Sequence, residues 1–268
     1  PSSAASDVYK RQEKHDVGAT LVYHQKERMM HISDSEEYAV LPYRQQGLAG
    51  RVTYGFDKRY LVEANFGYNG SENFAPGKRF GFFPSVALKW NAAKENFLKD
   101  VRWIDELSLR LSAGRTGNDA IATYRSLEAY GTTTNGYLFG GTQSASFFPS
   151  RVANPNLTWE KTTLYNAGLD FSAFDGRLNI TVDGYYSTTR DLLLSLQTIH
   201  TTGYTSRFTN LGKTSNRGVE VSVESRNIVK PKFGWTTSFT LSHNKNKIVK
   251  LDGEQTQIIS GSQIHMIG

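Results

Sequence analysis

The chain has 268 residues, of which 38% are hydrophobic and 12% aromatic, and its formal net charge is +6. The aromatic content argues against a disordered chain, because disordered segments contain few aromatic residues. No block of five or more Lys and Arg residues occurs, so the sequence gives no support to a nucleic-acid partner. The absence of cysteine excludes disulfides and thiolate metal sites.

The beginning of the chain differs in character from the rest. Residues 1–12 (PSSAASDVYKRQ) are small and polar and predict neither a strand nor a helix. We interpret them as a non-native leader, and residues 13–268 as one partial domain. His15–Tyr23 is the first predicted strand, and a long polar loop follows over 25–45. The acidic residues of this loop are Asp34, Glu36 and Glu37.

Eight further segments alternate between apolar and polar residues with a period of two, so that each predicted strand has one apolar and one polar face. These segments are 48–56, 62–68, 82–90, 107–113, 165–171, 178–184, 219–223 and 235–241. The pair Asp175-Gly176 separates two of them, which is a strong signal for a hairpin. The sequence therefore predicts an all-β chain of about nine antiparallel strands.

The connections between these strands alternate in length. The short or medium ones are 57–58, 91–103, 174–176 and 227–232, and the long ones are 25–45, 70–79, 115–158 and 191–213. Antiparallel neighbours place all the short connections at one end. Short periplasmic turns opposite long extracellular loops are typical of an up-and-down transmembrane β-barrel. No window of 18 apolar residues predicts a transmembrane helix.

Charged side chains share the polar parity of the predicted strands. They are Arg51, Glu63, Lys89, Arg110, Asp170, Asp183, Glu220 and Glu224. In a barrel they would face the lumen, where they either contact a plug or cargo or only keep the interior wet. Arg110, within an alternating strand, must point into water or find an acidic partner.

Signals for catalysis and for cofactors are missing from the sequence. No Gly-x-Ser-x-Gly motif occurs, the six histidines lack metal-ligand spacing, and Gly114–Asp119 lacks the Lys-Ser/Thr ending of a phosphate loop. We therefore expect no enzyme, metal site or cofactor. Two functions remain: a transporter wall, or a soluble antiparallel β-sandwich that binds glycans through exposed aromatic residues. They differ in whether the apolar parity faces lipid or a second sheet.

Six stretches, in this order, resemble the C-terminal barrel of the SusC/RagA-type TonB-dependent outer-membrane transporters of Bacteroidetes. They are GLAGRVTYGFDKRYLVEANFGYNGSENFAPGKRFGFFPSVALKWN, LSLRLSAGRTGND, NPNLTWEKTTLYNAGLDF, RLNITVDGYYSTTRDLLL, TNLGKTSNRGVEVSVE and WTTSFTLSHNKNKIVKL, or about two-thirds of the chain. The resemblance implies a barrel of about 22 strands in the outer membrane and an N-terminal plug coupled to the TonB system. It also implies a SusD-like lipoprotein partner and oligosaccharide or peptide cargo.

The sequence departs from this family's full pattern. It has no plug-domain pattern, no TonB box and no closing strand with a terminal aromatic residue. We therefore expect a fragment of a transporter that lacks the plug domain, and the sequence of this stretch does not identify the cargo.

Overall fold

The structure is a computed structural model that describes residues 2–11, 14–29, 42–121, 124–133, 136–197, 201, 203–204, 206–251, 257–260 and 263–267. The acidic cluster predicted at residues 34–37 lies outside the described residues. Among the residues that are described, no helix is long and apolar enough to cross a membrane.

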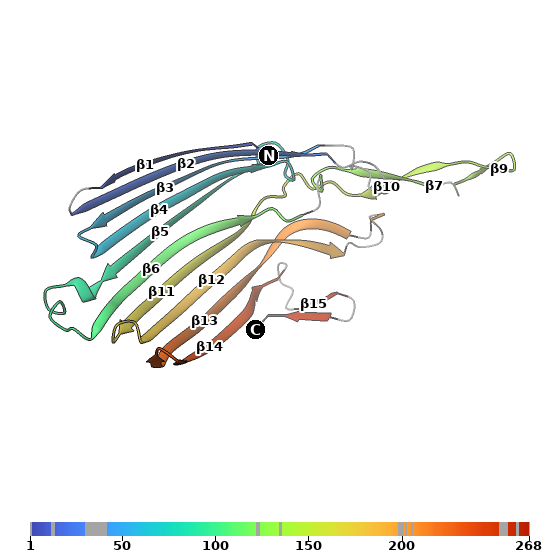
Figure 1. The fold of residues 1–268 in the computed structure, drawn as a ribbon. Helices are drawn as coiled ribbons and strands as arrows, with labels where there is room; N and C mark the ends of the chain where they lie inside the picture. Colours follow the sequence, from blue (N-terminus) through green and yellow to red (C-terminus); the bar gives the residue numbers. More distant parts are fainter. Residues whose placement is uncertain are drawn as a thin grey trace.

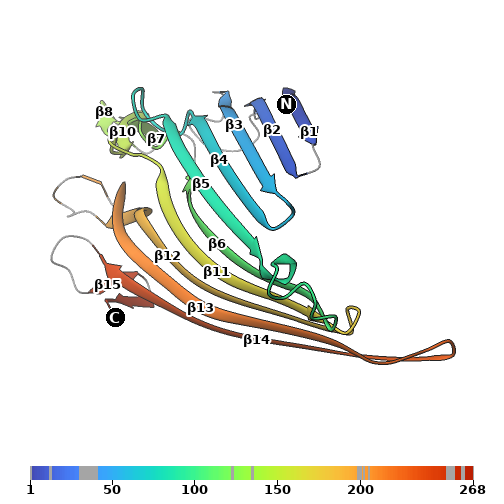
Figure 2. The ribbon, with the colours of Figure 1, turned by 90° about the vertical axis from the view of Figure 1, so that its left-hand side faces the viewer.

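One antiparallel sheet of ten strands dominates the chain (Figure 1). The order of its strands across the sheet is the same as their order along the sequence. The strands, in order, are β1 (Ser2–Arg11), β2 (His15–Arg28), β3 (Tyr43–Phe56), β4 (Tyr60–Ser71), β5 (Phe80–Asn91), β6 (Ile104–Asn118), β11 (Glu160–Ala173), β12 (Leu178–Gln197), β13 (Ser206–Lys230) and β14 (Phe233–Lys250). Figure 2 shows that this sheet is strongly curved, as expected of part of a barrel wall.

All nine predicted strands are present, as β2–β6 and β11–β14. The prediction that residues 1–12 form no strand is wrong, because β1 pairs with β2 along its whole length, from Ser2 opposite Gln25 to Arg11 opposite Asp16. A strand can form there from small polar residues because the neighbouring edge of β2 supplies the hydrogen bonds. That residues 1–12 are a non-native leader stays a prediction.

The two ends of the sheet differ, as predicted. At the short-turn end, β3 and β4 are joined by residues 57–59, β11 and β12 by 174–177, and β13 and β14 by 231–232. The medium connection between β5 and β6 holds one helical turn, the 3-10 helix η1 (Ala92–Lys94). The opposite end carries the long connections and is the long-loop end of the sheet.

The long-loop end contains more regular structure than the sequence suggests. The connection between β6 and β11 forms four short strands, β7 (Ala129–Thr133), β8 (Leu138–Phe139), β9 (Thr142–Gln143) and β10 (Ser146–Arg151), which extend away from the sheet in Figure 1. A last small hairpin joins β15 (Gln257–Ser260) and β16 (Gln263–Met266).

The loop predicted over 191–213 is wrong, because β12 and β13 continue into it and remain paired as far as Gln197 and Ser206. Asp191, with φ of +57°, has no partner in this pairing and interrupts the alternation there. The apolar run that follows it has no period of two, so a pattern search does not recognise this part of β12 as a strand.

The hairpin of β11 and β12 forms where Asp175-Gly176 predicts it. Phe174, Asp175 and Gly176 have φ values of 60°, 55° and 70°, a left-handed run that glycine adopts at no steric cost. Beyond the turn, Ala173 pairs with Leu178, and Leu169 pairs with Val182. The register therefore places the apolar residues of both strands on one face and their polar residues on the other.

A small core closes the long-loop end. Phe74, Leu157 and Trp159 are buried against one another, and Phe83 of β5 packs on them. The Trp159 indole N–H donates to the Arg79 carbonyl at 2.9 Å, so this core also fixes the start of β11 against the loop before β5. Most other large apolar side chains of the sheet are exposed, on the face opposite to its charged residues.

Candidate functional site

The polar face of the sheet carries all eight charged residues that the sequence analysis singled out. Arg51 is opposite Asn65, Lys89 is opposite Arg110, and the row continues through Gly168 and Asp183 to Glu220. Glu63, Asp170 and Glu224 have the same parity on β4, β11 and β13. The structure thus places all eight on one surface, although they form several separate clusters.

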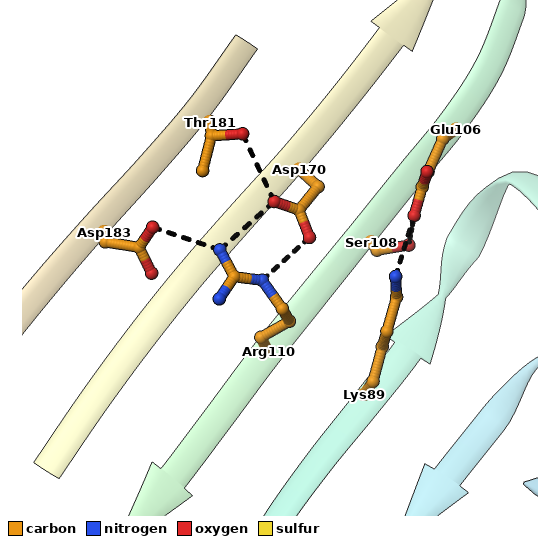
Figure 3. A network of polar contacts seen from close by, with 7 residues as sticks. All are labelled: Lys89, Glu106, Ser108, Arg110, Asp170, Thr181 and Asp183. Atoms are coloured by element: carbon orange, nitrogen blue, oxygen red, sulfur yellow. Dashed lines mark hydrogen bonds and ion pairs between the residues drawn. The ribbon is translucent and has the colours of Figure 1, made fainter. Parts of the chain in front are cut away.

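The central cluster is formed by Arg110 of β6 and two aspartates (Figure 3). The guanidinium donates to Asp170 from Nε at 2.7 Å and from Nη2 at 3.1 Å, and Nη2 also donates to Asp183 at 3.1 Å. Thr181 Oγ1 donates to Asp170 at 3.4 Å. Arg110 therefore has the acidic partner that its position in the strand demands, and it crosslinks three adjacent strands.

A glycine makes this crosslink possible. Gly168 is the residue of β11 that lies directly between Arg110 and Asp183 in the register. A Cβ atom at this position would lie 2.5 Å from Asp183 Oδ1 and 2.7 Å from Arg110 Nη2. The guanidinium therefore crosses β11 over a residue without a side chain, and any other residue would displace it.

Lys89 turns away from its neighbour Arg110 and pairs with Glu106, its Nζ lying 2.8 Å from Oε1 (Figure 3). Ser108, fully buried, donates to the same carboxylate oxygen at 2.9 Å. Glu106 was not among the charged residues predicted for this face. The signal that identifies it is parity, because 106, 108 and 110 share one face of β6.

The remaining predicted residues lie at the two sides of this centre. Arg51 donates to Glu63 at 2.6 Å on the β3–β4 side. On the β13 side, Glu224 lies 3.7 Å from Arg226. Glu220 is directly opposite Asp183, and within the described residues no ion pair reaches it. The face of β12 and β13 therefore has more carboxylates than its own cations neutralise.

A polar network at the long-loop end joins β3 to the end of β6. The hydroxyl of Tyr43 donates to Asp119 at 2.9 Å, and Gln45 Nε2 donates to the same carboxylate oxygen at 2.9 Å. Burial is the main cause that raises the pKa of Tyr43 to about 12, and the adjacent Asp119 carboxylate raises it further. Tyr43 therefore remains a neutral donor at any physiological pH.

A second network holds the short-turn end. Glu95, just after η1, accepts from the Tyr60 hydroxyl at 2.5 Å and from the Trp90 indole at 3.2 Å, and Arg59 donates to its other oxygen at 3.1 Å. The hydrogen bonds from Tyr60 and Trp90 are the largest causes that lower the pKa of the Glu95 carboxyl. Glu95 thus ties the β3–β4 and β5–β6 connections together.

The opposite face of the sheet is apolar and uncovered. Val52, Leu111 and Leu241 are 54%, 55% and 58% exposed. Two rows of exposed aromatic residues border it, one towards the short-turn end (Tyr54, Tyr60, Trp103, Phe174, Trp235) and one towards the long-loop end (Tyr23, Tyr68, Phe80, Phe82, Tyr165, Tyr186).

The spacing of these rows fits a bilayer. On β4, Tyr60 and Tyr68 are eight residues apart, which is about 20 Å along the barrel axis for a tilted strand. An outward apolar band between two aromatic girdles is the lipid-facing surface of a transmembrane barrel. Among the described residues no second sheet packs on this face, so the alternative of a soluble sandwich is not supported.

Comparison with known proteins identifies the family. Residues 16–264 match the family described as "TonB dependent receptor-like, beta-barrel". The chain belongs to the TonB-dependent receptor β-barrel family. Its members are outer-membrane receptors for transport and not enzymes, which confirms the expected class and location.

Two curated relatives of this TonB-dependent receptor chain are similar in sequence. TonB-dependent receptor P3 of Formosa agariphila is 39% identical over 212 residues, covering 79% of the chain and 21% of the relative. TonB-dependent receptor SusC of Bacteroides thetaiotaomicron is 39% identical over 208 residues, covering 76% and 21%. The chain therefore spans about a fifth of the length of these relatives.

Solved structures agree with the sequence relatives. A chain of the RagAB peptide transporter has a TM-score of 0.86 and 25% identity, and the match covers 99% of this TonB-dependent receptor chain and 32% of that one. The siderophore receptor PirA of Acinetobacter baumannii, at 12% identity and a TM-score of 0.55, shares the fold alone. The SusC/RagA resemblance is thereby confirmed.

Proposed function

We propose that this chain forms part of the wall of an importer for nutrient oligomers, glycans or peptides, which works with a SusD-like lipoprotein and is driven by the TonB system through a plug domain. The observation that carries the proposal is the match of 99% of the chain to the RagAB peptide transporter, together with 39% identity to SusC. The transporter in that solved structure is a peptide importer, so a peptide cargo has the stronger support.

The polar face of the sheet would line the lumen. Its central cluster is rigid, because Arg110 is held by three hydrogen bonds from two strands. Next to this cluster, the carboxylates of Asp183 and Glu220 are directly opposite each other on β12 and β13. Among the described residues, Asp183 pairs with Arg110 and Glu220 has no ion pair. A cationic side chain of the plug, or a cationic group of the cargo, would neutralise this pair.

A cell-based uptake assay tests the proposed function. A strain lacking the gene is complemented with the full-length gene that carries this chain, and the uptake of labelled oligopeptides and oligosaccharides is measured. The proposal expects uptake of one class, loss of uptake when TonB is deleted, and co-purification of a lipoprotein with the barrel.

Two variants connect the assay to the lumen residues. Asp183→Asn with Glu220→Gln is expected to lower uptake while the barrel still assembles, and Glu224→Gln, at the exposed pair with Arg226, is the control and should leave uptake unchanged. Uptake that continues without TonB, or a barrel that transports neither class, contradicts the proposal.

A further inference from the structure

We propose that the outer wall of β11–β14, just beyond the girdle residues Tyr165 and Tyr186, binds the phosphate-bearing head group of an anionic lipid, whose acyl chains lie in an adjacent apolar groove. This goes beyond the proposed transport function. It depends only on the membership of the chain in the outer-membrane barrel family.

A row of cations crosses four adjacent strands on this wall. Lys161 of β11 is directly opposite Arg190 of β12, Arg190 is opposite Lys213 of β13, and Lys213 is opposite Lys250 of β14. Directly opposite residues have Cβ atoms about 5 Å apart, and like charges in such positions destabilise a sheet. A row of four cations is therefore favourable only when an anion neutralises it.

Further cations continue the patch towards the membrane. Arg217 of β13 is opposite both Tyr186 and Lys245, so it lies in the row of the outer aromatic girdle. Lys247 of β14, opposite Ser215, lies between this girdle row and the row that runs from Lys161 to Lys250. Arg217, Lys245 and Lys247 have the same outward parity as the apolar band. Lys250 has the other parity by number and joins the row through the register shift beside Lys213.

The described acids near the patch do not balance this charge. A shallow hollow beside the upper row is lined by Arg115, Lys161, Arg190 and Lys213, and its only carboxylate is that of Asp191. Asp191 lies 3.4 Å from Lys161 and so accounts for one cation. The other cations of the hollow have no carboxylate among its lining residues, which leaves a site of complementary charge for phosphate groups.

An apolar groove begins directly below the cations. It has a volume of about 980 Å³, and its walls include Leu88, Leu111 and Val219. The surface is recessed there because Ala167 and Gly184, paired neighbours on β11 and β12, are small. Arg217 and Lys245 line the polar end of the same groove. The groove therefore combines an apolar channel, which suits an acyl chain, with a cationic end, which suits the phosphate attached to it.

The position of the patch favours a membrane lipid over a soluble anion. The long-loop end of a barrel of this family is extracellular, and aromatic girdles lie at the level of the head groups. Arg217 is two residues from Val219 of the lipid-facing band, which is about 7 Å along the strand. Cations at this depth meet the phosphates of the outer leaflet, each strengthening binding about fivefold.

Native mass spectrometry of a complete barrel that contains these strands tests the proposal. The barrel in a non-ionic detergent is titrated with dioleoyl phosphatidic acid and, separately, with dioleoyl phosphatidylcholine. We expect selective retention of phosphatidic acid. The variant Lys161→Gln/Arg190→Gln/Lys213→Gln should weaken its binding roughly 100-fold, since each cation contributes about fivefold.

Matched controls separate the patch from general charge. The variant Lys58→Gln/Lys94→Gln/Lys99→Gln removes three cations at the short-turn end and should bind phosphatidic acid like the wild type. Gly184→Phe should fill the groove and weaken the binding of the acylated lipid while leaving the cations in place. The retained heat-modifiability of each variant reports that its barrel is folded.

Three outcomes would overturn the proposal. The first is equal retention of phosphatidylcholine and phosphatidic acid by the wild-type barrel, which needs no variant to fold. The second is equal loss of binding in the control variant. The third is displacement of the lipid by inorganic phosphate at equal concentration, which would assign the patch to small anions. Loss of oligomer uptake bears on the proposed transport function and leaves the lipid result unaffected.

Discussion

Replacement of Arg110 by methionine tests the central cluster of the polar face. Methionine keeps much of the side-chain length and removes the charge, so Asp170 and Asp183 lose their common partner and lie near Glu220. Removing one partner of a buried ion pair costs about 3–5 kcal/mol, whereas an exposed pair contributes about 0–1 kcal/mol.

The exposure of the cluster decides between these two limits. The side chain of Arg110 is 35% exposed, and those of Asp170 and Asp183 are 25% and 21% exposed. Water therefore screens part of the repulsion between the carboxylates. We expect Arg110→Met to lower the free energy of unfolding of a complete barrel by about 1–3 kcal/mol.

Urea unfolding of the barrel in lipid vesicles measures this change, with the loss of the heat-modifiable band as the readout. The triple variant Arg110→Met/Asp170→Asn/Asp183→Asn should recover most of the lost stability, because it removes the repelling charges as well. Arg226→Met is the control, since its pair with Glu224 is 3.7 Å long and half exposed, and it should change the stability by less than about 0.5 kcal/mol. A triple variant as unstable as the single one would refute the argument from charge.

Three further changes follow from the structure. Leu169→Arg places a charge in the lipid-facing band and should destabilise the barrel by about 2–4 kcal/mol in vesicle unfolding, whereas Leu164→Arg, on the polar face, should cost less than about 1 kcal/mol. Gly168→Ala should displace the Arg110 guanidinium and cost about 1 kcal/mol, while Gly184→Ala, where a Cβ would meet nothing closer than 3.9 Å, should be neutral in the same assay. Glu95→Gln should remove an acid-dependent part of the stability, measured as the midpoint of thermal unfolding against pH.

The sign of the Glu95 effect follows from its lowered pKa. The carboxyl has a lower pKa in the folded chain than its ordinary value of 4.5, so its contribution to stability is fully present above pH 4.5 and is lost as the pH falls through the folded value. The wild type should therefore lose stability in acid faster than the variant. Parallel pH profiles would show that Glu95 contributes nothing, and equal damage by Leu164→Arg and Leu169→Arg would mean that the assigned faces are wrong.

The alternation of residues is what made the fold predictable. In β11 and β12 the parity of Leu169 and Val182 gives the lipid face, and Asp175-Gly176 gives the turn between them. The parity also placed all eight charged residues on one surface. These features depend on local geometry with a period of two, and a sequence carries that period directly.

Features that depend on neighbouring strands were not predictable in the same way. β1 forms because β2 offers an edge, although its own residues are small and polar. The role of Gly168 appears only when Arg110 and Asp183, 73 residues apart, are brought to either side of it. The row from Lys161 to Lys250 likewise exists only once the register of four strands is known.

The central claim is that the strands form a barrel wall with lipid on the apolar face and water on the polar face. This chain contains no cysteine, so single cysteines are introduced at Leu169, Asp170, Val182 and Asp183, and any cysteine elsewhere in the complete barrel is first replaced by serine. Each is spin-labelled in a complete barrel reconstituted in vesicles, and its collision rates with oxygen and with a water-soluble nickel complex are measured. Labels at 169 and 182 are predicted to collide mainly with oxygen, and labels at 170 and 183 mainly with the nickel complex. Equal collision rates at all four positions, or the reverse order, would contradict the account.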